Sequence, residues 1–252
     1  MNKIFSEQLK IIKKDSSRLK KFSKNINENQ NFCIETENIF FDYSRNIIDK
    51  KSVENLLKLA HLIDIKKNYK KLISGHISNK SENRQVLHPA MRNTSSLLDK
   101  NIIKDINKHK VILKKISQDI ISGKNKSFSK KKYTDIVSVG TGGSFFGIKA
   151  SYEALKNYSS KNIKLHFISN LDFTENKDLL SSLDPNKTLF IIVSKSLRTI
   201  ETIENIKKIK FWLKKYSKNY NVMQNFLAVT ENESEAKKLG INQRNIIKIW
   251  EW

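Results

Sequence analysis

The sequence has 252 residues, 38% of them hydrophobic, and its 48 lysines and arginines against 25 acidic residues give a formal net charge of +23. This length and apolar content suffice for one large domain or two small ones with a buried core, and the single cysteine, Cys33, excludes an internal disulfide and indicates a reducing compartment. No apolar stretch is long enough for a signal peptide or a bilayer span, so we predict a cytoplasmic protein with no membrane partner.

The positive charge leaves two classes of partner to compare. Nucleic acid is one, because phosphate neutralisation drives that binding. The lysines are spread along the whole chain, however, and the runs at 13–21 and 124–132 are typical of solvated helix faces and loops. No helix-turn-helix, zinc-finger or aromatic RNA-binding signature accompanies them. We therefore predict no nucleic-acid partner and expect the charge to attract anionic small molecules.

The first part of the chain has a helical pattern. Apolar residues recur at helical spacing up to about Ser122, as in residues 52–73 and 102–121. We predict a mainly helical N-terminal region over residues 1–122. A glycine-, serine- and lysine-rich segment, residues 122–132, then separates this region from the rest and is typical of a linker or a surface loop.

Short β-branched runs dominate the second part of the chain. They occupy residues 135–139, 163–169, 188–194 and 225–229, and a helical stretch follows each. This alternation is typical of βαβ units, so residues 123–252 are predicted to form an α/β domain with a parallel sheet. Two strand-to-helix turns stand out by composition, and the carboxyl edge where they lie is the place where ligands usually bind.

The first of these turns is rich in glycine. Gly140, Gly142 and Gly143 permit positive φ and leave room for a ligand, while Ser144 offers a hydroxyl at the start of the next helix. Phe145 stands where the dinucleotide fingerprint needs a third glycine, and the P-loop sequence is also missing, so neither NAD nor ATP is indicated and no cofactor is predicted. Tight packing alone explains such glycines, and so does a bound anion or sugar.

The second turn is rich in hydroxyls. Ser194, Ser196 and Thr199 lie within six residues at the head of a helix, and Lys195 and Arg198 add positive charge. A helix cap explains only one of the hydroxyls. Hydroxyls, backbone amides and the positive end of the helix can converge on one phosphate. Two such turns on neighbouring strands predict a phosphosugar pocket, with the phosphate here and the sugar at the glycine turn.

These residues resemble the glucose-6-phosphate isomerase family. "GTGGS", residues 140–144, resembles the Gly-x-Gly-Gly-Ser turn of the family's first sugar isomerase (SIS) domain, and "SKSLRTIET", residues 194–202, resembles its phosphate loop. The segments "FDYSRN", "RQVLHPAMRN", "LHFISNLD" and "FLAVTENESEAKKLGI" resemble family segments in the same order, so the likeness covers the chain from about Phe40. It implies an SIS-type three-layer αβα sandwich over residues 123–252.

The resemblance also implies which residues bind substrate. Ser196 replaces a family threonine and keeps the hydroxyl, whereas Leu197 and Arg198 replace the usual phenylalanine and threonine. By position in the motifs, the first turn would contact the sugar and the second would surround the phosphate. The substrate-binding residues implied in this way are Gly143, Ser144, Ser194, Lys195, Ser196 and Thr199.

The family interconverts glucose 6-phosphate and fructose 6-phosphate in glycolysis and gluconeogenesis, a reaction that needs a base and an acid. In the family, the residues that supply them follow the segment resembling "IIKIWEW", which ends here at Trp252. We therefore expect a truncated N-terminal half, natural or a fragment, that binds the sugar phosphate without a catalytic residue or metal of its own. Glu201 is expected to serve the helix dipole, and His88 and Arg92 to be structural.

One alternative stays open, a non-catalytic SIS-domain sensor or regulator that binds a sugar phosphate. The segments at 41–46 and 84–93 resemble the isomerase rather than a regulator and favour the enzyme family. For the full-length family the resemblance implies a homodimer.

Overall fold

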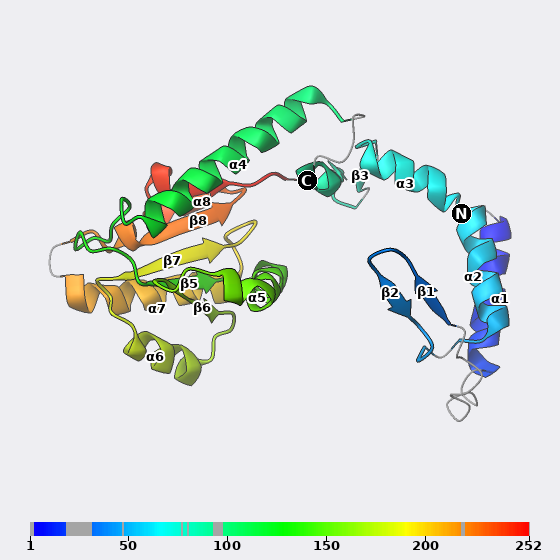
Figure 1. Cartoon of the computed structure of the whole chain (residues 1–252), viewed down its shortest axis with the longest axis horizontal. Coiled ribbons are helices and arrows are strands. Elements are labelled where there is room, and N and C mark those ends of the chain that lie inside the picture. Colours follow the sequence, from blue (N-terminus) through cyan, green and yellow to red (C-terminus); the bar gives the residue numbers. More distant parts are fainter. Residues whose placement is uncertain are drawn as a thin grey trace. The chain divides into compact units, whose positions relative to one another are not determined.

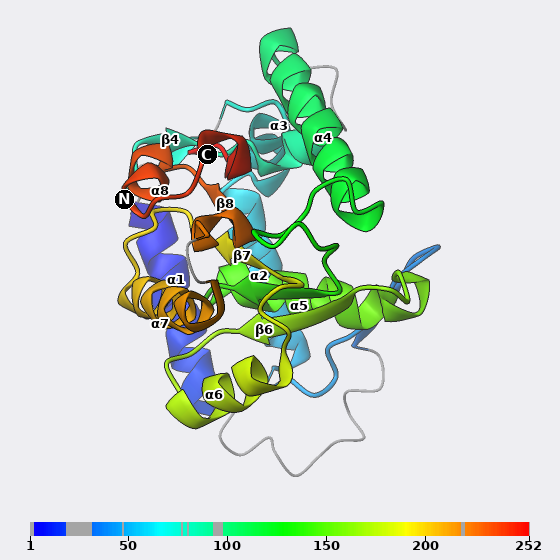
Figure 2. The same cartoon turned by 90° about the vertical axis from the view of Figure 1, so that its left-hand side faces the viewer.

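The computed structural model describes residues 3–18, 32–46, 48–76, 78–79, 81–92, 98–217 and 220–251. Trp252, where the expected truncation falls, lies outside these residues. The chain divides into two compact units, Met1–Lys100 and Asn101–Trp252 (Figures 1 and 2). Within the described ranges, no helix combines the length and apolar character that a bilayer span requires.

The first unit is mainly helical, as predicted, and also contains two short antiparallel hairpins. Aspartate side chains cap two of its helices: Asp49 accepts a hydrogen bond of 2.7 Å from the Ser52 amide, and Asp64 one of 3.2 Å from the Lys67 amide. The elements are α1 (Lys3–Arg18), β1 (Cys33–Glu35), β2 (Phe40–Asp42), α2 (Lys50–Leu62), α3 (Ile65–Ile73), β3 (Ser78–Asn79), β4 (Arg84–Gln85) and the 3₁₀ helix η3 (His88–Arg92).

The second unit is built on a five-stranded sheet in which every pairing is parallel. The strands are β5 (Asp135–Val139), β6 (Lys164–Ile168), β7 (Thr188–Val193), β8 (Phe226–Thr230) and β9 (Ile246–Lys248), in the order β6-β5-β7-β8-β9. The first four are the predicted strands, and β9 is an additional one. The helices are α4 (Lys100–Ile121), α5 (Gly143–Leu155), α6 (Phe173–Ser182), α7 (Ile200–Ser217) and α8 (Glu233–Lys238), with 3₁₀ turns η4 (Lys156–Tyr158), η5 (Val222–Asn225) and η6 (Gln243–Asn245).

Helices cover both faces of this sheet. On one face, the buried side chains of β5, β7 and β8 pack with α6, α7 and α8 in the larger core cluster, while on the other face α4 packs through Ile116 and Ile120. Helix α5 adjoins the second face, where its Phe145 lies 5.7 Å from the Phe167 ring of β6. Figure 1 shows α4 and α7 on opposite sides of the strands. The predicted α/β fold, a parallel sheet flanked by helices, is confirmed. The predicted domain boundary at residues 122 and 123 falls within the second unit, directly after α4, and stays a prediction.

The strand order changes direction between β5 and β7. The chain leaves β5 to form β6 on one side of it, and then returns to form β7 on the other side. The connections that follow β5 and β7 therefore run in opposite directions from the same carboxyl edge, which is the arrangement that opens ligand sites in doubly wound sheets. The glycine turn follows β5 and the hydroxyl-rich turn follows β7.

Candidate functional site

Close packing at Gly140 brings the two turns together. Val139 of β5 is paired with Ile192 of β7, so Gly140 lies opposite Val193, where the second turn begins. A Cβ built on Gly140 would lie 2.8 Å from the Val193 carbonyl oxygen and 3.1 Å from the Cβ of Ser144. Only glycine fits here, because the nearest atom belongs to the backbone and cannot swing away. The two turns thus lie next to each other, as predicted, and their backbones are in close contact at Gly140.

The glycine turn leaves its backbone open to solvent. Gly142 caps α5 at φ 55° and ψ −124°, a conformation that favours glycine. A Cβ on Gly142 or on Gly143 would meet no atom within 4 Å. Within the described chain, the amides of these two glycines donate no hydrogen bond, and the half-buried Ser144 makes none through its hydroxyl. This turn therefore offers donors to a ligand that can approach the backbone closely.

The second turn, residues 194–199, is called the hydroxyl loop below. Its first serine is buried, and the Ser194 hydroxyl accepts a hydrogen bond of 3.1 Å from the Leu197 amide. The Ser196 hydroxyl accepts one of 3.3 Å from the Arg198 amide. Leu197 has a positive φ of 51° and a side chain buried in the larger core cluster. Thr199 stands directly before α7. Hydrogen bonds to its own serine hydroxyls therefore hold the loop in shape, and the buried Leu197 side chain anchors it to the core.

The strand next to β7 holds the hydroxyl loop from one side. The buried Thr230 hydroxyl at the end of β8 donates to the Lys195 carbonyl oxygen at 2.9 Å, and the Asn232 side chain donates to the Ser196 carbonyl oxygen at 3.2 Å. These bonds turn two loop carbonyls toward β8. Within the described residues, the amides of Ser196 and Thr199 donate no hydrogen bond. Thr230 and Asn232 support the loop without belonging to it, and no sequence motif marks them.

The charged groups of the loop are tethered by weak ion pairs at its rim. Lys195 lies 3.9 Å from Glu231, and Arg198 lies 3.8 Å from Glu235. Both cations are substantially exposed, so solvent screens these pairs strongly and either cation can turn toward an anion. Glu201 is exposed in the first turn of α7, where a carboxylate is stabilised by the helix dipole, as expected from the sequence.

The six predicted substrate-binding residues therefore all lie along one sheet edge, in two adjoining turns. Gly143 and Ser144 begin α5, and the other four lie in the hydroxyl loop that precedes α7. His88 and Arg92 lie in η3 of the first unit. Open amides, hydroxyls, two cations and two helix N-termini at one edge are suited to binding an anion that also carries hydroxyls.

Comparison with known proteins agrees with this arrangement. The family model described as phosphoglucose isomerase matches residues 42–252. A glucose-6-phosphate isomerase of Francisella tularensis subsp. holarctica (strain FTNF002-00 / FTA) is 35% identical over 249 residues, which are 96% of this chain and 46% of the relative. That of Coxiella burnetii (strain Dugway 5J108-111) is 37% identical over 223 residues, 87% of this chain and 41% of the relative.

A solved structure shares the fold. The crystal structure of a glucose-6-phosphate isomerase from Chlamydia trachomatis superposes with a TM-score of 0.71 at 23% sequence identity, over 97% of this chain and 48% of that one. The chain spans about half the length of the curated relatives it matches.

Proposed function

The chain belongs to the phosphoglucose isomerase family, and we propose that it forms the part of a glucose-6-phosphate isomerase that binds the substrate. The observation that supports the proposal is the junction of the two turns at Gly140, because it brings the open donors of the glycine turn next to the hydroxyl loop at one sheet edge. The substrates proposed are glucose 6-phosphate and fructose 6-phosphate.

The hydroxyl loop would hold the phosphate. The hydroxyls of Ser194, Ser196 and Thr199, together with loop amides, can donate charge-assisted hydrogen bonds at the positive end of α7. The exposed Lys195 and Arg198 side chains can move from their half-buried carboxylate partners to the phosphate, because the phosphate carries more charge than one carboxylate. The phosphate would thereby fix one end of the substrate.

The glycine turn would then face the sugar. Gly143 presents an amide with no side chain in front of it, and Ser144 presents a hydroxyl close to Gly140, the residue at which the two turns meet. Proton transfer between two sugar carbons needs a base at those carbons. Glu201, close to the phosphate end, would repel the substrate's charge rather than reach its carbons. We propose that proton transfer depends on groups outside these two turns, and that a second subunit of the family's homodimer takes part in the complete site.

Calorimetry tests the phosphate-binding role. The 252-residue chain is titrated with glucose 6-phosphate and with glucose, and we expect saturable binding of the phosphorylated sugar only. The double variant Ser196→Ala/Thr199→Ala should weaken this binding by about 10-fold or more for each charge-assisted bond removed. The matched control, Thr174→Ala/Ser182→Ala, removes two exposed hydroxyls from α6 and should bind as the parent does. Equal affinity for glucose and glucose 6-phosphate would refute the proposal.

A coupled activity assay tests whether the chain binds the substrate without catalysing the isomerisation. The chain alone is expected to give no turnover above background, since a positioned general base contributes about 10² to 10⁴-fold. Mixing it with a separately expressed C-terminal half of a full-length relative should restore turnover. Turnover by the chain alone that is lost in Glu201→Gln would instead make Glu201 the base.

A further inference from the structure

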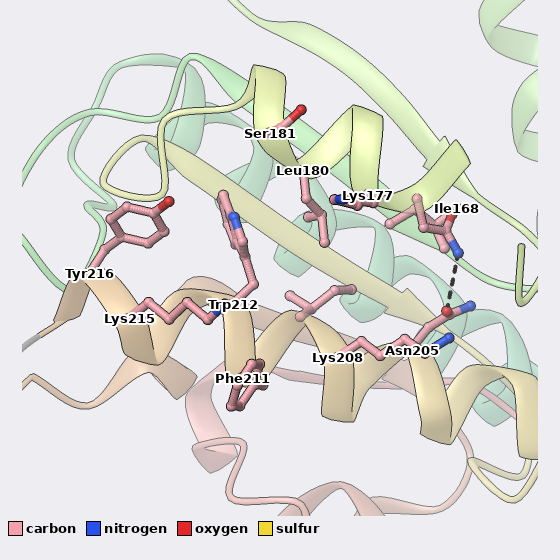
Figure 3. Close-up of a pocket in the computed structure, with 12 residues that line it drawn as sticks. Ile168, Lys177, Leu180, Ser181, Asn205, Lys208, Phe211, Trp212, Lys215 and Tyr216 are labelled. Atoms are coloured by element: carbon pink, nitrogen blue, oxygen red, sulfur yellow. Dashed lines mark hydrogen bonds between the residues drawn. The ribbon is translucent and has the colours of Figure 1, made fainter. Parts of the chain in front are cut away.

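A pocket with a cavity volume of about 360 Å³ opens between α6 and α7, away from both turns (Figure 3). None of the six predicted substrate-binding residues lines it. Its floor is apolar, because Ile168, Leu180 and Ile209 from the larger core cluster line it. This volume is within the range that small-molecule sites occupy.

One end of the pocket is closed by buried amides. The Asn176 side chain donates to the Asn205 side-chain oxygen at 3.4 Å, and the side chains of both residues also donate to the Asn170 carbonyl oxygen, at 3.1 and 2.8 Å. Figure 3 shows the bond between the two side chains, which joins α6 to α7. These bonds fix the distance between the helices, so the pocket is a formed feature of the fold.

Aromatic side chains of α7 form the other end. The Trp212 ring packs edge-on against Phe190 of the core at 6.1 Å and lies 5.8 Å from the Tyr216 ring. Phe211 and Tyr216 are 66% and 53% exposed, although large aromatic side chains are usually more buried. In Figure 3, Trp212 and Tyr216 stand next to each other on α7 and reach toward α6. Such rings bind planar apolar groups by stacking or edge contacts.

The charged residues that line this pocket have one sign. Lys177 from α6 and Lys208 and Lys215 from α7 line it, and no aspartate or glutamate is among the lining residues. Glu204, one turn before Lys208 on α7, lies 2.7 Å from Lys207 and is not among the lining residues. An apolar, aromatic cavity edged by three cations is complementary to a ligand with an apolar ring system and a negative group.

We propose that the pocket between α6 and α7 is a binding site for a small aromatic anion, such as a bicyclic aromatic carboxylate. The ring system enters between Leu180 and Trp212, and the carboxylate remains at the lysine edge. The proposal does not depend on the isomerase function, because it involves no residue of the two turns. It adds a second site of a different ligand class to the same domain.

The test is a titration of the full 252-residue chain with 2-naphthoate, followed by ¹H–¹⁵N NMR. We expect a saturable shift of the Trp212 indole signal, assigned with Trp212→Phe. The Trp250 indole, which donates to Asp105 at 2.6 Å elsewhere, serves as the internal reference and should not move. The neutral isostere 2-naphthamide should bind about 10-fold more weakly.

Two triple variants separate local from overall charge. Lys177→Gln/Lys208→Gln/Lys215→Gln should lower the 2-naphthoate affinity about 10-fold. The control variant replaces three lysines of α7 that do not line the pocket, Lys207→Gln/Lys210→Gln/Lys214→Gln. It has the same net charge as the first variant and should retain the parent affinity. Ser181→Phe, a substitution of an exposed lining residue, should block binding without disturbing the core.

Three results would overturn the proposal. Equal affinity for 2-naphthoate and 2-naphthamide would show an apolar groove without selection for anions. Equal losses of 2-naphthoate affinity in both triple variants would show that the net charge of the chain, and not the lining lysines, attracts the anion. The third result combines two observations: the chain self-associates in sedimentation in a way that Ser181→Phe abolishes, and the Trp212 signal does not shift. It would show that a second copy of the chain occupies the groove.

Discussion

The glycine turn and the hydroxyl loop leave neighbouring strands at the same edge, but different interactions hold them in place. The glycine turn is positioned by backbone contact, with Gly140 against Val193 and no side-chain cap on α5. The hydroxyl loop is positioned by side chains, through Ser194, Thr230 and the buried Leu197. The Ser144 hydroxyl of the glycine turn makes no hydrogen bond within the described residues, so it is available to a ligand. The Ser194 and Ser196 hydroxyls of the hydroxyl loop, by contrast, also hold the loop in shape.

The largest effect is expected from Gly140→Ala. The added methyl would meet the Val193 carbonyl oxygen at 2.8 Å, and relieving this overlap requires separation of β5 from β7 at the site, at a cost of about 3 kcal/mol in the free energy of unfolding. Binding of glucose 6-phosphate should fall with it. Urea unfolding and calorimetry measure the two effects.

Gly147→Ala is the matched control. It places the same methyl in α5, where no atom lies within 4 Å, and should stabilise the domain by about 0.5–1 kcal/mol because alanine favours the helix. If both alanine variants unfold alike, contact at Gly140 is not what positions the glycine turn.

A smaller effect is expected from Thr230→Val. Loss of the hydroxyl leaves the Lys195 carbonyl oxygen without one of its donors and should cost about 1–3 kcal/mol of stability. Thr188→Val is the control, because the buried Thr188 hydroxyl makes an equivalent bond of 2.7 Å to the Asp184 carbonyl oxygen at the opposite end of β7. Both variants should lose similar stability, but only Thr230→Val should weaken binding of glucose 6-phosphate. A comparable loss of binding in Thr188→Val would mean that the support from β8 has no special role.

The smallest effect on stability is expected from a pair of serine variants. Ser144→Ala should leave the free energy of unfolding unchanged, since the hydroxyl makes no hydrogen bond within the described chain, and should still weaken sugar-phosphate binding. Ser194→Ala should weaken binding and also cost about 1 kcal/mol of stability, because the Leu197 amide loses its buried acceptor. Thermal unfolding followed by calorimetry compares them. Equal stability of the two variants would remove the distinction between the turns.

Strands with a buried, β-branched run could be predicted from the sequence, and shorter ones could not. Residues 189–193 are apolar throughout because β7 is central and covered on both faces. The β9 strand has only three residues at the edge of the sheet, and its pairing with β8 depends on the tertiary fold. The hairpin of β1 and β2 has six exposed residues and no alternation of apolar and polar side chains to indicate it.

The residues of the two turns could be predicted because composition alone marks them. Glycines after a strand and three hydroxyls before a helix are local signals. Thr230 and Asn232 carry no such signal, since their contact with the hydroxyl loop depends on β8 lying beside β7. Likewise, nothing in the sequence indicates that Leu197 takes a positive φ. Support across strands becomes apparent only when the order of the strands is known.

Leu197 has a consequence for the thermodynamics of binding. Its side chain is inserted in the core, whereas its neighbour Ser196 is half-buried and Arg198 is exposed, so the loop cannot change shape without withdrawing a leucine from an apolar environment. Withdrawal costs about 1.5–3 kcal/mol for a fully buried leucine, which keeps the loop ordered before any ligand arrives. A phosphate that binds here as proposed would therefore meet a preorganised set of donors, without the conformational-entropy cost of ordering them, about 1–2 kcal/mol for each backbone residue.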